Sequence, residues 1–218
     1  MSIGTGRLFA LLVRRDLALM AARPGEWLLP MLFFLLVAII LPFALGPQPA
    51  VLGRFAPGIL WVGALLASLM PVATLFALDS ADGTLDQLAV RGVAGELLAA
   101  ARMLALWLGF AGPLLVILPL AALLLAMDMA GLGMLALALA MGCLGLCALA
   151  VVAASLTIGA KGGGGLVALV VVPLAVPMLL FGSRPAEPGA LLLTSAAALL
   201  LAAIAPFAAG AALRGGQG

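Results

Sequence analysis

Residues 27–46 read WLLPMLFFLLVAIILPFALG, and no side chain in this run is charged. A helix needs about 20 mostly apolar residues to cross the hydrocarbon core of a bilayer. The run belongs to the first of six windows that lack Asp, Glu, Lys and Arg, and the shortest window has 22 residues. The windows are 27–53, 55–78, 103–127, 129–160, 162–183 and 188–213. We therefore expect an all-α integral membrane protein with six transmembrane helices.

The composition excludes the other broad classes of protein. The mean hydropathy is +1.38 and 67% of the 218 residues are apolar, whereas soluble domains average about 45–50%. Strands that span a membrane alternate apolar with polar residues, and these windows are continuous apolar runs. The net charge of +2 gives no basic surface for nucleic acid. A single domain, 1–218, is predicted, with spans at about 27–46, 57–78, 98–126, 131–158, 163–182 and 189–213.

An amphipathic helix is predicted over residues 5–22, ahead of the first span. Apolar residues recur at helical spacing on one side and arginines group on the other, as in helices that lie on a membrane surface. The apolar residues are Phe9, Val13, Leu17 and Met20, and the arginines are Arg7, Arg14 and Arg15. Asp16 interrupts the apolar side, and Pro24 with Gly25 ends the helix. A simple basic anchor that sets the orientation is the alternative.

The distribution of basic residues predicts that both termini lie in the cytoplasm, because cytoplasmic loops carry an excess of Lys and Arg. With the N-terminus inside, the cytoplasmic side holds Arg7, Arg14, Arg15, Arg23, Arg91, Arg102, Lys161 and Arg214. Only Arg54 and Arg184 fall on the other side, where Asp128 is also expected.

The sequence predicts no catalytic, cofactor-binding or metal site of its own. Histidine and tyrosine are absent, which removes the commonest haem-iron ligand and the commonest general base. Cys143 and Cys147 favour apolar packing, with a thiolate pair for a metal or haem as the alternative. Lys161 precedes the glycines 162–165, the reverse of the order in a phosphate-binding loop. ATP would therefore be bound and hydrolysed by another subunit.

Residues 79–97 form the longest interruption between spans, and they are the predicted contact with such a subunit. Asp82 is placed to cap a short helix, and Asp86 suits the positive end of the helix dipole. Leu85 and Leu88 would present an apolar edge to a groove on the partner. The residues assigned to this contact are Asp79, Asp82, Gly83, Thr84, Leu85, Asp86, Gln87 and Leu88. An ordinary solvated connector is the alternative.

Several motifs resemble those of a known family. They are PFALGP at 42–47, RFAPGILWV at 54–62, DGTLDQL at 82–88, KGG at 161–163, PLAVP at 173–177, PFA at 206–208 and ALR at 212–214. The segment 79–91 resembles the coupling loop of ABC-2 type permeases. The whole chain resembles the CcmB family, the haem exporter permease subunits of cytochrome c maturation.

The resemblance implies a multi-pass subunit of the bacterial inner membrane, a homodimer within its complex, that pairs with a CcmA-like cytoplasmic ATPase. It further implies neighbouring CcmC-like and CcmD-like membrane subunits, a CcmE-like haem chaperone as an indirect partner, and haem as the substrate. Two other functions stay open. The chain could be a mechanical adaptor that conveys ATPase motion to a haem-handling neighbour, or a generic ABC-2 exporter of another small apolar molecule.

Overall fold

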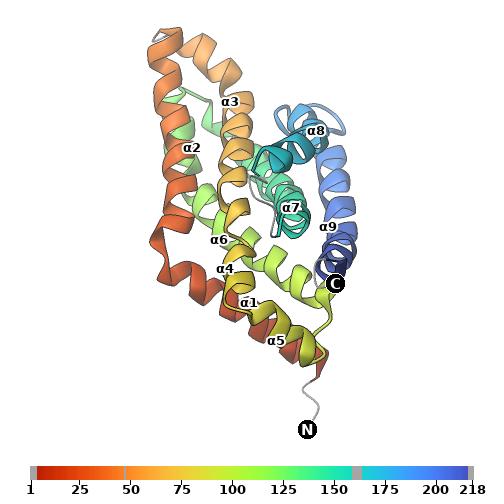
Figure 1. Ribbon diagram of the computed structural model, residues 1–218. Coiled ribbons are helices and arrows are strands. Elements are labelled where there is room, and N and C mark those ends of the chain that lie inside the picture. The colour runs from red at the N-terminus through yellow and green to blue at the C-terminus, as the bar shows by residue number, and fades with distance from the viewer. Residues whose placement is uncertain (1–3, 47, 159–163, 216–218) are drawn as a thin grey trace.

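The computed structural model describes residues 4–46, 48–158 and 164–215, and every regular element in these ranges is helical (Figure 1). The helices are α1 (Thr5–Ala22), α2 (Pro24–Leu45), α3 (Pro49–Leu69), η1 (Met70–Ala73), α4 (Ala77–Ala81), α5 (Thr84–Val90), α6 (Gly95–Leu124), η2 (Met129–Gly131), α7 (Leu132–Leu156), α8 (Gly164–Gly182) and α9 (Ala190–Gly215). The all-α fold class is therefore confirmed.

Five segments within the described residues are long and apolar enough to cross a membrane. They are Trp27–Leu45, Pro49–Ala81, Gly95–Leu124, Met129–Leu156 and Ala190–Gly215. Helix α8 has 19 residues, of which Val171–Gly182 form a shorter apolar helix. The first residue of the predicted span 163–182 lies outside the described residues, as does Lys161. The number of six spans thus stays a prediction.

The helix at the second predicted span begins earlier than the sequence predicts. Helix α3 begins at Pro49 rather than at residue 57, because proline suits the first turn of a helix, where its missing N–H has no partner to lose. Pro57 therefore lies inside α3. At the other end α3 gives way at Met70 to the 3-10 helix η1, and the apolar segment continues to Ala81, beyond residue 78. In the described ranges, the helices at the other predicted spans begin and end within three residues of the predicted limits, the start of the span 163–182 lying outside these ranges.

Helix α7 forms the centre of the bundle. It packs against α3, α6, α8 and α9, and 67% of its most apolar window is buried, compared with 17% for that of α2. In Figure 1, α1 lies across the lower end of the molecule, together with α4, α5 and the last turns of α9. The α2–α3 connection lies at the upper end. We call these the α1 end and the opposite end.

The side chain of Trp61 on α3 fills a slot between α7 and α8. A Cβ added at Gly142 of α7 would lie 1.9 Å from the indole ring, and one at Gly182 of α8 would lie 2.1 Å from it. Trp61 is 1% exposed, and its indole N–H has no hydrogen-bond partner in the described part of the chain. A buried donor without a partner costs about 1–3 kcal/mol. The packing of the ring, rather than its polar atom, therefore joins α3 to α7 and α8.

This packing distinguishes Gly142 from Gly133, which lies in the same helix. Gly142→Ala should lower the stability of the protein by about 1–3 kcal/mol, the usual effect of overfilling a packed core. Gly133→Ala is the matched control, since a Cβ there meets nothing within 4 Å and alanine restricts the unfolded chain. Thermal unfolding of both variants in detergent measures the difference. Equal melting temperatures would mean that Trp61 is not wedged against α7.

Candidate functional site

Four charged side chains from three helices meet at the α1 end. Arg15 and Asp16 come from α1, Asp79 from α4 and Arg102 from α6. Only 5% of the Arg102 side chain and 8% of the Asp16 side chain are exposed. We call this group the charged junction. Its two bases and two acids cancel in charge, and pairing is what makes buried charges tolerable.

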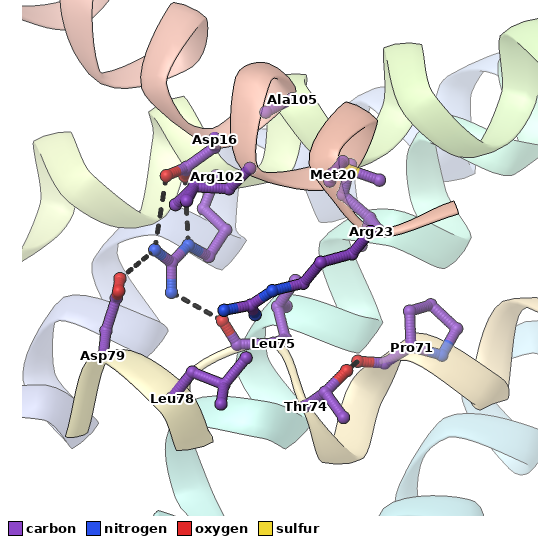
Figure 2. Close-up of a pocket in the computed structure, with 12 residues that line it drawn as sticks. Asp16, Met20, Arg23, Pro71, Thr74, Leu75, Leu78, Asp79, Arg102 and Ala105 are labelled. Carbon is purple, nitrogen blue, oxygen red and sulfur yellow. Dashed lines mark hydrogen bonds and ion pairs between the residues drawn. The ribbon is translucent and has the colours of Figure 1, made fainter. Parts of the chain in front are cut away.

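Every nitrogen of the Arg102 guanidinium donates a hydrogen bond within the junction (Figure 2). Nε donates to Oδ2 of Asp16 at 3.1 Å. Nη1 donates to the carbonyl oxygen of Leu75 at 2.6 Å. Nη2 donates to Oδ2 of Asp79 and, at 3.4 Å, to Oδ1 of Asp16. The guanidinium carbon also lies 4.6 Å from the centre of the Phe76 ring. Arg102 therefore ties α6 to α1 and to the chain that leads into α4.

Arg15 is the second arginine of the charged junction, and it bonds the same two carboxylates as Arg102. Its Nε donates to Oδ1 of Asp16 at 2.9 Å, and its Nη2 donates to Oδ2 of Asp79 at 2.5 Å. Burial lowers the pKa of Arg15, but the charges of Asp16 and Asp79 and their hydrogen bonds outweigh burial, so this pKa lies above its ordinary value. The guanidinium is charged at any physiological pH, and each carboxylate is shared by two arginines.

The cleft beside the junction is small. Its volume is about 60 Å³, and its lining includes Met20, Arg23, Pro71 and Thr74. Figure 2 shows Arg23 extending into it. Clefts that bind organic ligands have volumes of about 300–1,000 Å³. We therefore interpret the junction as a mechanical joint between helices.

A second contact at the α1 end joins the start of α6 to the end of α9. A Cβ added at Gly95 would lie 3.2 Å from the Cα of Gly210, and one at Gly210 would lie 2.8 Å from the backbone nitrogen of Glu96. Arg214 of α9 donates a hydrogen bond to the carboxylate of Glu96. Because two glycines face each other, the two backbones approach closely, and α9 is fixed to the first turn of α6, at the end of the 79–97 segment.

The predicted contact segment is built of two short helices. Asp79 lies in α4 and Asp82 follows its last residue. Gly83 stands before α5 with φ of 68°, a left-handed conformation that glycine adopts easily. The prediction that Asp82 caps α5 is wrong, because Gly83 occupies the cap position and no side chain bonds there. Asp86 lies in the first turn of α5, as predicted.

The predicted exposed leucine pair is also wrong. Leu85 is 8% exposed and belongs to the core of the chain itself, and Leu88 is half-buried against the same core. Helix α5 turns this apolar edge toward the chain's own core. The two leucines are therefore removed from water without the help of a second subunit. Thr84 is half-buried, and Asp82, Asp86 and Gln87 are exposed. The large apolar side chain that α5 exposes is instead Val90, at 89%.

Helix α1 has the predicted bounds, Thr5–Ala22. Arg7 and Arg14 are exposed. Phe9, Val13 and Met20 pack against the core and Leu17 is half-buried. Arg15 does not share the exposed side of α1 with the other arginines, because Asp79 draws it into the junction.

The sequence reasoning missed Asp16 and Arg102 as functional residues. Asp16 interrupts the apolar side of α1 because it is buried there against Arg102. A carboxylate on the apolar face of a helix indicates that it has a buried basic partner. The sequence does not identify that partner, because Arg102 lies 86 residues away from Asp16.

Cys143 and Cys147 are free thiols, both buried in α7. Among the residues that the structure describes, no group of three or more His, Cys, Asp or Glu is placed to hold a metal ion.

The chain is similar to known proteins over nearly all of its length. Residues 7–216 match the family described as CcmB protein. Heme exporter protein B of Bradyrhizobium diazoefficiens is 41% identical over 214 residues, which cover 94% of this chain and 96% of that protein. The protein of the same name from Paracoccus denitrificans is 41% identical over 213 residues, covering 94% and 97%. That of Escherichia coli K12 is 36% identical over 215 residues, covering 95% and 98%.

Removing Arg102 should destabilise the protein strongly. Arg102→Gln leaves Asp16 and Asp79 buried with Arg15 as their remaining partner in the junction, and breaking a buried ion pair costs about 3–5 kcal/mol. Asp16→Asn combined with Arg102→Gln should cost less than the sum of the two single changes, because the two residues share one network. Thermal unfolding in detergent measures all three variants.

Arg184→Gln is the control for this experiment. Arg184 pairs with Glu187 at 3.5 Å with 69% of its side chain exposed, and exposed pairs contribute about 0–1 kcal/mol. A loss from Arg102→Gln no larger than that from Arg184→Gln would contradict the interpretation of the junction as a joint.

Proposed function

The chain belongs to the CcmB protein family, and we propose that it is the membrane permease subunit of a haem exporter that serves c-type cytochrome biogenesis. The similarity extends over nearly the whole of each relative, and the relatives share the name Heme exporter protein B. That shared name favours haem over another small apolar substrate. Helices long and apolar enough to cross a bilayer suit a subunit of this kind.

The energy for export comes, in this proposal, from a partner ATPase of the CcmA type. The charged junction carries the argument. Asp79 begins the segment assigned to the ATPase contact, and its carboxylate is hydrogen-bonded to both Arg15 and Arg102. A displacement of this segment would therefore act directly on α1 and α6. The segment is short and charged and lies at the α1 end, and its residues Asp82, Asp86 and Val90 are exposed, as a contact with another subunit requires.

The remaining partners are proposed from the resemblance to the CcmB family. We propose a homodimer of this chain in the bacterial inner membrane, beside CcmC-like and CcmD-like subunits, with a CcmE-like chaperone as the recipient of haem. Both termini and α5 would face the cytoplasm. The grouping of α1, α4, α5 and the end of α9 at one end of the molecule supports this orientation (Figure 1).

A second candidate function is that of an adaptor that moves a haem-binding neighbour and transports nothing. The charged junction supports the adaptor as well as the permease, because either function needs a joint that connects three helices. The absence of His and Tyr from the sequence also suits a chain that does not ligate iron. The two functions can be separated with purified complex that lacks the CcmC-like subunit, in haem-loaded proteoliposomes. If the chain is a permease, ATP should drive haem across the bilayer. If it is an adaptor, no haem should cross.

Val90 provides a test of the ATPase contact that spares the fold. Val90→Asp should reduce co-purification of the ATPase about tenfold or more, since burying such a side chain in an interface contributes roughly 1.5–3 kcal/mol. Abundance of the chain should not change, because Val90 is 89% exposed. Val90→Leu keeps the apolar group and should behave as the wild type.

Leu85→Asp is the comparison variant, because it should disturb the folding of the chain, whereas Val90→Asp should disturb only the contact with the ATPase. Leu85 is buried in the chain itself, so this change should lower abundance and not only coupling. Normal ATPase co-purification and normal c-type cytochrome levels with Val90→Asp would place the contact elsewhere.

The orientation can be tested by labelling single cysteines with a membrane-impermeant reagent. Ala186→Cys should be labelled in intact spheroplasts, and Asp82→Cys only after permeabilisation. Both positions are exposed, and the native Cys143 and Cys147 are buried and give little background. Labelling of Asp82→Cys in intact spheroplasts would reverse the proposed topology.

A further inference from the structure

A larger cleft lies at the opposite end of the molecule from the charged junction. Its volume is about 300 Å³. Its walls come from the first half of α3, from the connection between α6 and α7 with the first turn of α7, and from the linker between α8 and α9. The residues that matter here are Pro57, Met127, Asp128, Met134, Arg184 and Glu187. This is the end that the proposed orientation directs to the periplasm.

The turn that leads into this cleft, directly before its lining residue Met127, has a strained backbone. Ala126 has a positive φ of 50°, which costs a residue other than glycine of order 1–3 kcal/mol. A Cβ added at Gly53 of α3 would lie 2.6 Å from the carbonyl oxygen of Ala126. Glycine therefore lets α3 approach this turn and support it. Such strain persists where the surrounding structure imposes it, and it occurs preferentially at functional sites.

The chemistry of the cleft combines apolar walls with an acidic mouth. The flexible thioether side chains of Met127 and Met134 adapt well to a partner surface. The charged lining residues are Asp128, Glu187 and Arg184, so two acids and one base give a net charge of −1. Arg184 is already paired with Glu187 at 3.5 Å. Asp128 accepts the N–H of Ala130 at 3.0 Å and, among the described residues, has no basic partner.

These properties fit a protein segment better than a free small molecule. Haem and phospholipids both present anionic groups, and the acidic mouth disfavours them. The volume lies at the lower limit of ligand clefts, yet it suffices for one large apolar side chain. A Lys or Arg next to that side chain would pair with Asp128, in the way that charge complementarity directs partners to an interface.

We propose that this cleft receives a segment of a neighbouring membrane subunit of the exporter, a segment that places a large apolar side chain beside a Lys or Arg. The inference rests on the proposed membership of a multi-subunit haem exporter. It assigns the periplasmic contact of the chain to residues far from those that contact the ATPase.

A photocrosslinking amino acid at position 186, an exposed residue of the cleft, tests this in the purified complex. We expect a crosslink to one other membrane subunit, mapped by mass spectrometry to a segment that contains Lys or Arg. Adding Asp128→Lys should reduce the yield at least about tenfold. Adding Arg184→Gln, the matched control at the same mouth, should keep or raise it, because it removes a positive charge.

Crosslinks only to lipid, to haem or to a second copy of this chain would overturn the inference, and so would an unchanged yield with Asp128→Lys. The outcome is independent of transport. A mapped crosslink in a complex that moves no haem in proteoliposomes would uphold the docking site and reject the permease function.

Discussion

The buried guanidinium of Arg102 constrains the whole α1 end. A charge that is taken out of water must have its hydrogen-bonding groups satisfied, or it destabilises the fold by several kcal/mol. Here those partners come from α1, from α4 and from the backbone at Leu75. The positions of three helices thus depend on one side chain. Arg15 completes the charge balance, which lets the group stay buried without a net charge.

Much of the fold could be predicted from hydropathy alone, because a bilayer requires long apolar helices. The bounds of α1 also followed from its periodic pattern. The start of α3 could not, since Pro49 and Pro57 are equally good first residues for a helix, and packing decides between them. The burial of Leu85 was missed for a related reason. A short amphipathic helix has an apolar side, but its sequence does not tell whether that side faces its own chain or another.

The charged junction illustrates a different limit of sequence reasoning. Arg15 and Asp16 lie in the middle of α1, and Asp79 and Arg102 are single charges among apolar and small residues, so nothing near them in the sequence identifies their partners. Only the fold brings Asp16 and Asp79 to the same arginine. Trp61 is similar: its fit depends on two glycines in α7 and α8, and neither glycine stands out in a chain that contains 27 of them. Long-range complementarity of this kind requires three-dimensional information.

Helix α6 begins a few residues before Arg102 and ends just before Met127, so it connects the two ends of the molecule. Its 30 residues correspond to a rod of about 45 Å at 1.5 Å per residue. A tilt of about 5° around its first turn would carry the far end through about 4 Å. Pro113 and Pro119 lie in its second half, where a proline bends a helix and weakens its hydrogen bonding. The helix therefore has the geometry of a lever arm that is stiff near its pivot and compliant toward its tip.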